Sequence, residues 1–295
     1  MRCLIDADIL AYECSFAGQY NDESTGEFVM KDFDVVEEHL QQKIKEILEE
    51  CMSDEEPVMF LTGDELLANH LNRRPKWCEP SEEIELRPSF RYYEAITKQY
   101  KGSRKSPKPL HYHNIRAYML ATYNCVVSDG LEADDMLAIN QTDDTIICSI
   151  DKDLRQVPGW HYSWSIGARP SIPIYMVDEF GTLEMVGKPK KLKATGLRSL
   201  FAQVLMGDTV DNIQGIDGLG PVGAYKILSE CITEMELFLA TAKTYYDSDP
   251  DNWEKKLREH IDLVYMIRKL DENGEPVRYK YPEGWQYLWV GQVGN

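Results

Sequence analysis

Residues 125–153 read CVVSDGLEADDMLAINQTDDTIICSIDKD, and this stretch decides the fold class. Residues 125–127 and 145–149 are short apolar runs rich in β-branched side chains, which is typical of buried strands. The segment between them is long enough for a helix that begins near Glu132. A strand, a helix and a second strand in this order predict a parallel crossover. We therefore expect an α/β fold with a mainly parallel sheet flanked by helices.

The same alternation extends toward the N-terminus. Residues 2–6 and 58–62 are predicted strands, and residues 32–52 carry apolar side chains every three or four positions, which indicates an amphipathic helix. From about residue 195 the sequence pattern changes to predicted helices that are separated by glycine turns. We expect an α/β domain over residues 1–194 and a smaller helical part over residues 195–295.

Length and composition indicate a folded protein. The chain has 295 residues, of which 43% are hydrophobic, so it can form one large domain or two modest ones. Its seven cysteines are scattered and never arranged as Cys-x-x-Cys, which argues against a disulfide framework or a zinc ribbon and indicates reduced thiols. Apolar runs stay well short of the roughly 18 residues needed to span a bilayer. We expect a cytoplasmic protein with no membrane partner.

The net charge is −18, from 32 basic and 50 acidic residues. Such a charge argues against general attraction to nucleic acid, which favours basic surfaces. Residues 1–60, however, hold 16 acids and 4 bases, whereas residues 95–128 hold six bases and no acid. The sequence therefore leaves room for a localised basic track. We interpret a second basic cluster, at residues 188–198, as a solvated face.

Acidic residues collect where predicted strands end and predicted helices begin. The candidate metal ligands are Asp6, Asp64, Glu132, Asp134, Asp135, Asp151, Asp153, Asp208 and Asp211. Positions three apart, such as Glu132 and Asp135, share one face of a helix, and parallel sheets hold their ligands beyond the carboxyl ends of the strands. Asp8 is the weakest candidate, because it can serve as the cap of the helix that follows.

So many converging carboxylates would repel one another and raise their own pKa values unless cations lay between them. Oxygen-only ligands select Mg²⁺ or Mn²⁺ over Zn²⁺, and the sequence offers no competing His-Glu-x-x-His or Cys/His set. Two such ions, about 4 Å apart, can activate a water and stabilise the leaving oxygen of a phosphodiester. The acidic set favours metal-dependent phosphoryl hydrolysis.

Four segments resemble motifs of the flap endonuclease family of 5′-nucleases. They are YKGSR at 100–104, GLEADD at 130–135, SIDKDLRQVPG at 149–159 and MGDTVDNIQGIDGLGPVGAYKIL at 206–228. The resemblance is to compact bacteriophage 5′→3′ exonucleases and to the 5′-nuclease domain of bacterial DNA polymerase I. It implies a PIN-like nuclease domain and a helical part with a helix-hairpin-helix-like motif. The implied activity is that of a metal-dependent 5′→3′ exonuclease or flap endonuclease in DNA replication, primer removal or recombination, in the host cytoplasm if a phage encodes it.

The resemblance also implies roles for individual residues. The first metal ion would be surrounded by Asp6, Asp64, Glu132, Asp134 and Asp151, with Asp135 in this site or beside it. The second would be held by Asp153, Asp208 and Asp211, with Asp151 close to both ions. Lys101 and Arg104 would contact the scissile phosphate and stabilise the charge of the transition state. We thus predict catalytic roles for Lys101, Arg104 and Asp151, DNA contacts by Tyr100 and Lys105, and two Mg²⁺ or Mn²⁺ ions.

Gly215, Gly218 and Gly220 resemble the turn of the family's helix-hairpin-helix variant. Glycines permit tight turns, and amides at the start of the next helix can hold a phosphate. Such contacts position a duplex without reading its sequence. The resemblance implies double-stranded or branched DNA with 5′ ends as the partner, with RNA–DNA hybrids and replication proteins as further partners and a K⁺ ion at the turn.

Two segments depart from the family pattern. Residues 104–132 form a short segment with Pro107 and Pro109, which disfavours the helical arch that flap endonucleases build there. Residues 71–89 form a Pro-interrupted insertion that is a candidate to compensate. Its basic residues are Arg73, Arg74, Lys76 and Arg87.

Two other interpretations fit part of the pattern. LIDAD at residues 4–8 resembles the nucleophile motif of haloacid-dehalogenase-like phosphatases, with Thr62 and the GDTVD run as further motifs. That interpretation leaves GLEADD and DKD without a role. The other is a non-catalytic DNA-junction-binding protein, and the complete acidic set argues against it.

Overall fold

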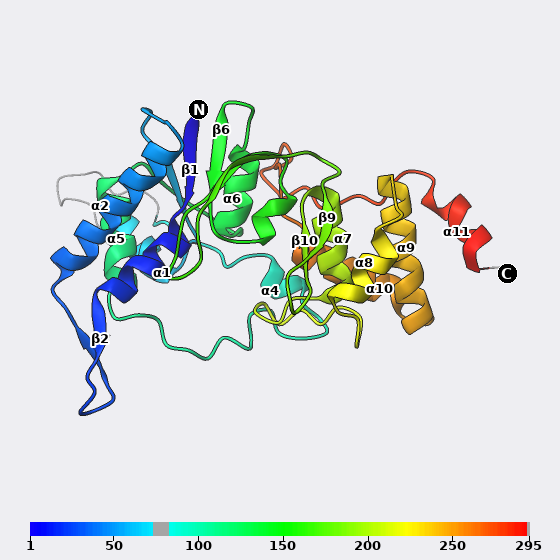
Figure 1. Cartoon of the computed structure of the whole chain (residues 1–295), viewed down its shortest axis with the longest axis horizontal. Coiled ribbons are helices and arrows are strands. Elements are labelled where there is room, and N and C mark those ends of the chain that lie inside the picture. The colour runs from blue at the N-terminus through cyan, green and yellow to red at the C-terminus, as the bar shows by residue number, and fades with distance from the viewer. Residues whose placement is uncertain (73–82, 294–295) are drawn as a thin grey trace. The chain divides into compact units, whose positions relative to one another are not determined.

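The computed structural model describes residues 1–72 and 83–293, with side chains up to residue 289 (Figure 1). The chain divides into two compact units. The first comprises residues 1–90, 106–150 and 159–176, and the second comprises residues 91–105, 151–158 and 177–295. This division differs from a single boundary after residue 194, because three segments that precede this boundary pack with the C-terminal part.

The first unit contains a six-stranded sheet in the order β5-β4-β1-β6-β7-β8. The strands are β1 (Arg2–Asp6), β4 (Val58–Leu61), β5 (Cys125–Val127), β6 (Thr145–Cys148), β7 (Gly159–Ser163) and β8 (Ile172–Val177). From β5 to β7 each strand is parallel to its neighbour. The mainly parallel sheet that the sequence predicts is thereby confirmed, and the predicted strands agree with β1, β4, β5 and β6 to within one residue.

Helices α1, α2 and α5 bury the main apolar cluster of this unit against the sheet. The helices of the unit are α1 (Ala7–Ala17), α2 (Phe33–Glu50), α3 (Glu65–Leu71), α5 (Tyr112–Thr122) and α6 (Ala133–Asn140), and a hairpin joins β2 (Gln19–Asn21) to β3 (Phe28–Met30). In α2 the buried residues Val36, Leu40, Ile44 and Ile47 recur every three or four positions, as the amphipathic pattern predicts. Tyr112, Ile115 and Met119 of α5 are also buried, so this helix of the short 104–132 segment belongs to the core.

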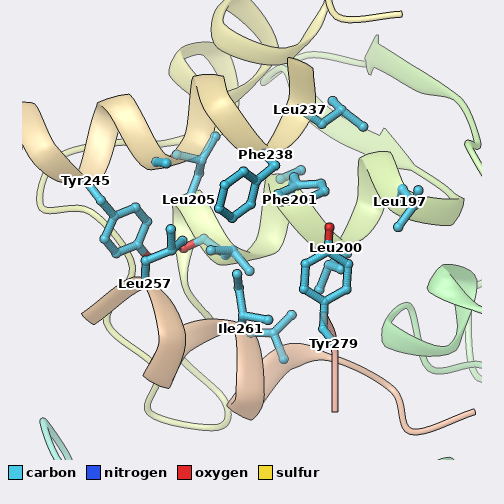
Figure 2. Packing of buried hydrophobic residues seen from close by; sticks show 14 of the residues in the cluster. Leu197, Leu200, Phe201, Leu205, Leu237, Phe238, Tyr245, Leu257, Ile261 and Tyr279 are labelled. Atoms are coloured by element: carbon cyan, nitrogen blue, oxygen red, sulfur yellow. The ribbon is translucent and has the colours of Figure 1, made fainter. Parts of the chain in front are cut away.

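The second unit is mainly helical. Its elements are α4 (Arg91–Glu94), the 3₁₀ turn η1 (Asp153–Gln156), β9 (Leu183–Val186), β10 (Lys191–Ala194), α7 (Gly196–Met206), α8 (Pro221–Leu228), α9 (Glu234–Ser248), α10 (Trp253–Val264) and α11 (Trp285–Val293). Helix α7 packs against α8, α9 and α10. Figure 2 shows its side chains Leu200, Phe201 and Leu205 among Phe238 of α9 and Ile261 of α10. The helical C-terminal part is confirmed, with an added β9–β10 hairpin.

The cysteines agree with the prediction of reduced, mostly buried thiols. The six that lie in the described ranges form no disulfide. Cys3, Cys51 and Cys148 meet in the core of the first unit, with their sulfur atoms within 4.8 Å of one another. In the part of the chain that the structure describes, no helix is long and apolar enough to cross a membrane.

Candidate active site

Two acidic clusters are present, one in each unit. The first lies where β1 and β4 end. Asp6 is the last residue of β1, and its carboxylate accepts hydrogen bonds from the Ile9 amide (3.2 Å) and the Ser149 hydroxyl (2.7 Å). Asp64 follows β4 and caps α3 by accepting from the Leu67 amide at 2.9 Å. Parallel strands thus deliver both carboxylates to the carboxyl edge of the sheet, as the sequence predicts.

The start of α6 adds further carboxylates at this edge. Glu132 caps the helix and Asp135 occupies its third position, and together they form a capping box in which the Glu132 amide donates to Asp135 at 3.2 Å. The Ala133 amide donates to the Thr62 hydroxyl at 2.9 Å, which fastens the helix start to the end of β4. Asp134 is half-buried in the first turn. The spacing of the GLEADD motif therefore serves the fold of this unit as well as the cluster.

Arg116 neutralises part of the first cluster. Its side chain is only 3% exposed, forms ion pairs with Asp8 (3.4 Å) and Asp64, and donates to the Thr62 carbonyl. Asp8 also accepts from the Thr62 amide at 3.0 Å. The predicted capping role of Asp8 is wrong, because Asp6 caps α1 and Asp8 lies in the first helical turn.

Sequence reasoning gave Arg116 no role beyond the basic run. The signal was present, because Arg116 falls on the same helical face as Tyr112, Ile115 and Met119. A charged residue within a buried apolar stripe requires partners of opposite charge. That requirement points to a buried ion pair, although the sequence alone does not say with which acids.

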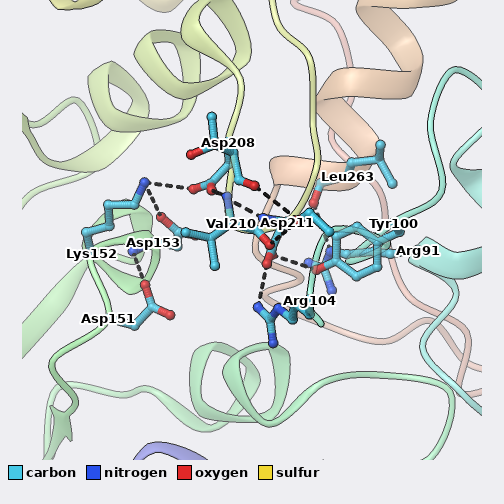
Figure 3. Close-up of polar contacts among 12 residues, drawn as sticks. Arg91, Tyr100, Arg104, Asp151, Lys152, Asp153, Asp208, Val210, Asp211 and Leu263 are labelled. Carbon is cyan, nitrogen blue, oxygen red and sulfur yellow. Dashed lines mark hydrogen bonds and ion pairs between the residues drawn. The ribbon is translucent and has the colours of Figure 1, made fainter. Parts of the chain in front are cut away.

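The second cluster comprises Asp151, Asp153, Asp208 and Asp211 (Figure 3). The Lys152 ammonium lies 2.7 Å from a carboxylate oxygen of Asp208 and 3.8 Å from one of Asp153. Asp208 also accepts from the amides of Val210 (2.7 Å) and Asp211 (3.3 Å). The Asp153 amide donates to Asp151 at 2.9 Å. The DKD and GDTVD segments therefore meet, as the sequence predicts.

Electrostatics differ among these four acids. Burial and the adjacent Asp151 charge raise the pKa of Asp153 to about 8, and burial also raises the pKa of Asp151. Burial acts in the same direction on Asp208, but the hydrogen bond and charge of Lys152, together with the amides of Val210 and Asp211, outweigh it and lower the pKa of that carboxyl. Two acids thus carry a penalty for ionisation that a divalent cation would relieve.

The segment that carries YKGSR is held against this cluster. The Tyr100 hydroxyl donates to Asp211 at 3.0 Å, and Arg104 donates to the same carboxylate at 2.5 Å. Tyr100 is only 3% exposed, so it supports the segment from within the core. Lys101 has a φ of 54°, a backbone conformation that is costly for a residue with a Cβ atom, and its amide donates to the Asp211 carbonyl at 2.9 Å.

Two buried residues that the sequence did not single out fix the other end of the segment. Arg91 donates to the carbonyls of Leu263 (3.0 Å) and Tyr265 (2.8 Å). Glu259 of α10 is 6% exposed and accepts from the Ile96 amide at 2.7 Å and the Thr97 amide at 2.6 Å. Residues 91–105 are therefore built into the second unit along their whole length.

The three glycines of the turn before α8 differ in their surroundings. Gly215 has a φ of 67°, and a Cβ atom there would lie 2.3 Å from the Gly207 amide nitrogen, so it serves close packing within the turn. Gly218 and Gly220 face open space, and Gly220 directly precedes α8. Only these two leave the backbone at the helix start accessible to a ligand.

The remaining predicted residues are placed as follows. Lys105 is exposed, and so is Arg104, whose side chain is 48% accessible. Arg87 of the insertion pairs with Asp129 at 3.0 Å. Arg73, Arg74 and Lys76 lie outside the described residues.

No protein-family model matches the chain. DNA polymerase I of Rhizobium leguminosarum is 32% identical over 117 residues, which cover 36% of this chain and 10% of the polymerase. Flap endonuclease Xni of Salmonella paratyphi B is 28% identical over 184 residues, which cover 58% of this chain and 66% of that protein. The chain thus spans about a tenth of the polymerase and just under two thirds of the endonuclease. The sequence resemblance to 5′-nucleases is confirmed, and it favours that interpretation over the phosphatase.

Two solved structures align with most or all of the chain. The T5 D15 protein crystallised with metal ions aligns with a TM-score of 0.45 and 13% identity, over 89% of this chain and 99% of that chain. The catalytic core of Rad2 in complex with DNA aligns with a TM-score of 0.40 and 15% identity, over 100% of this chain and 87% of that chain.

Proposed function

We propose that this protein is a divalent-metal-dependent 5′-nuclease that hydrolyses DNA phosphodiesters to leave 5′-phosphate and 3′-hydroxyl ends. The observation that carries the proposal is the presence of two carboxylate clusters in a chain whose sequence is similar to that of flap endonuclease Xni. Divalent cations at such clusters would activate a water and neutralise the charge that develops on a phosphodiester.

The donor chemistry of the acids suits Mg²⁺ or Mn²⁺. Both clusters offer oxygen donors, which hard divalent ions prefer. In the first unit Asp6, Asp64, Glu132 and Asp134 would hold one ion, with Asp135 beside them. In the second unit Asp153, Asp208 and Asp211 would hold another, with Asp151 as a further donor. The raised pKa values of Asp151 and Asp153 support this assignment, because a bound cation would favour their ionised forms. When bound, such ions lower the pKa of an attacking water and neutralise charge on the leaving oxygen.

The chain's own cations would complete the site. Arg104 is exposed and flanks Asp211, and Lys101 lies in the same turn, so both can approach a phosphate bound at the second cluster. An ammonium and a guanidinium there would hold the scissile group in line and stabilise the charge that develops on its oxygens. Lys105, next to Arg104, would extend this contact along the strand.

The turn before α8 would hold the duplex part of the substrate. Gly218 and Gly220 have open space around them, and the amides of Val222 and Gly223, which follow Pro221 at the start of α8, are of the kind that favours a phosphate. A K⁺ ion held by carbonyls of the turn would add a second charge for the backbone. The preferred substrates would be duplex or branched DNA with 5′ ends, with RNA–DNA hybrids and replication proteins as further partners in the cytoplasm.

The test is the substitution Asp151→Asn, assayed on 5′-labelled nicked, gapped, flapped and blunt duplexes in Mg²⁺. We expect cleavage to fall roughly 1,000-fold, because the metal site supplies several kcal/mol and each 1.36 kcal/mol is tenfold in rate. Asp251→Asn, at an exposed acid of the same unit, is the control and should cleave normally. Undiminished cleavage by Asp151→Asn would contradict the assignment. Mononucleotide products would identify an exonuclease, and flap-length products an endonuclease.

A further inference from the structure

The second unit carries a basic segment that the proposed active site does not use. Residues 185–207 contain five basic residues and no acid, in a chain whose net charge is −18. The segment runs from β9 through β10 into α7. From sequence alone we interpreted its basic cluster as a solvated face, and the structure gives reason to revise that interpretation.

Four of the five basic residues gather on the β9–β10 hairpin. Leu192 and Ala194 of β10 pack against the core of the unit. Side chains alternate along a strand, so Lys191 and Lys193 lie on the opposite face, about 7 Å apart. Lys188 and Lys190 lie in the connecting turn. All four lysines are exposed, and one acid, Glu184, stands opposite Lys193 in the strand register.

These lysines are not engaged in holding the fold. Within the ranges that the structure describes, none of the four forms an ion pair. Arg198, the fifth basic residue, behaves differently, because its guanidinium donates to the carbonyls of Leu228 (3.2 Å) and Cys231 (2.6 Å). The basic residues of this segment therefore fall into two groups. Arg198 stabilises the fold, and the four lysines have charges that are available to a ligand.

The hairpin is connected to the second acidic cluster by a hollow of about 70 Å³. Lys193 lines one part of it, and Lys152, Asp153 and Arg155 line another. The hollow thus places three cations next to one of the proposed metal ligands. Helix α8, which follows the glycine turn, packs against both β9 and β10. The hairpin therefore lies beside the helix whose N-terminal turn we propose to contact DNA, and Lys193 shares a hollow with Asp153.

We propose that the face formed by Lys188, Lys190, Lys191 and Lys193, here called the hairpin face, binds the phosphate backbone of duplex nucleic acid. The proposal rests on the proposed function, since it assigns this surface to the same substrate. Lysine ammonium groups are point charges without the planar fork that reads base edges, so the contact is independent of sequence. An anionic membrane would also attract lysines, but the hollow that leads to Asp153 favours a substrate that reaches the acidic cluster.

The test is the binding of a fluorescein-labelled 20-base-pair duplex by fluorescence anisotropy, in EDTA and between 50 and 300 mM salt. The variant replaces all four lysines of the hairpin face by alanine. Each lost phosphate contact lowers the slope of log K against log salt by about 1, so we expect the slope to fall by about 2 to 4. A quadruple Lys→Arg variant should keep the slope of the parent protein. The melting temperature of each variant verifies that it is folded.

The matched control replaces Lys243, Lys255, Lys269 and Lys280 by alanine, since these are also exposed lysines of the second unit and the change in net charge is identical. A slope for the hairpin variant equal to that of this control would overturn the proposal. Loss of affinity for anionic vesicles without loss for the duplex would also overturn it. Binding is measured without cleavage, so the hairpin proposal can hold where Asp151→Asn contradicts the nuclease assignment, and the reverse.

Discussion

The two acidic clusters differ in how their charges are held. In the first unit a buried arginine and the amides of three helix starts hold the carboxylates. In the second unit backbone amides and the buried Tyr100 hydroxyl also hold the carboxylates, but the paired cations are Lys152 and Arg104, whose side chains are 61% and 48% exposed. A buried ion pair is costly to break, whereas an exposed cation exchanges readily with solvent or with another cation.

The difference suggests a division of labour. The first cluster is part of the architecture of its unit, because the residues that hold its acids also join β4 to α5 and α6. The second cluster is paired with exposed cations, which a metal ion can replace and for which a phosphate can compete with the acids. We therefore expect substitutions in the first cluster to lower both stability and activity, and substitutions in the second to affect activity with little or no loss of stability.

The largest expected effect on the free energy of unfolding is that of Arg116→Met. The substitution keeps the volume but leaves Asp8 and Asp64 without their buried cation, and breaking such a pair costs about 3–5 kcal/mol. Urea denaturation in EDTA measures the change. A loss below about 1 kcal/mol would mean that the first cluster does not depend on this arginine. The proposed difference between the two clusters would then be wrong.

The second prediction concerns the contribution of Asp153 to the pH dependence of stability. Its pKa is raised from 3.8 to about 8, so the folded state binds the proton more tightly than the unfolded state. The stabilisation is full below pH 3.8 and is lost as the pH rises through about 8. In EDTA, Asp153→Asn should flatten this decline, by on the order of 1 kcal/mol per pH unit at most. Parallel stability–pH curves for the two proteins would contradict the raised pKa.

The third prediction, of a smaller loss of stability, compares the capping boxes of two helices. Asp135→Ala removes the box of α6, and Thr233→Ala removes that of α9, far along the chain from the acids. Each should lower the free energy of unfolding by about 1 kcal/mol. Only Asp135→Ala should also reduce the rise in melting temperature that Mg²⁺ produces. Equal responses to Mg²⁺ would assign Asp135 to the fold alone.

The smallest expected change in stability is that of Arg104→Ala. The ion pair with Asp211 is exposed, and such pairs contribute under about 1 kcal/mol. Cleavage should nevertheless fall roughly 100-fold, because one donor to the transition state is lost. Urea denaturation and single-turnover cleavage give the two values. A drop in stability comparable to that of Arg116→Met would remove the distinction between the clusters.

The sequence predicted the elements that depend on local pattern. Strand composition located β1, β4, β5 and β6, and apolar spacing located α2. The carboxyl ends of parallel strands explain why Asp6 and Asp64 meet at one edge. Within the second unit, the grouping of Asp153 with Asp208 and Asp211 followed from motif resemblance, because no spacing rule relates segments more than 50 positions apart; the contact of Lys152 with Asp208 was not predicted.

The partners of the acids could not be predicted in the same way. Arg116 and Glu259 are ordinary charged residues in sequence, and their burial depends on which helix packs where. The capping role given to Asp8 failed because Asp6, at the strand end, has the extended backbone that a cap requires. The division into units could not be predicted from local sequence either, because residues 91–105 pack with partners more than 100 positions later in the chain.

The passage of the chain between the units has a consequence for synthesis. The chain crosses from one unit to the other after residues 90, 105, 150, 158 and 176. The YKGSR segment leaves the ribosome long before Asp211 and Glu259, to which residues 91–105 dock, so this part of the protein cannot assemble until synthesis has passed residue 259. Neither unit is a continuous stretch of gene, and a product truncated before Glu259 lacks part of the support of the second acidic cluster. A chain that stops before residue 259 therefore lacks a fixed YKGSR segment, which the proposed nuclease activity needs.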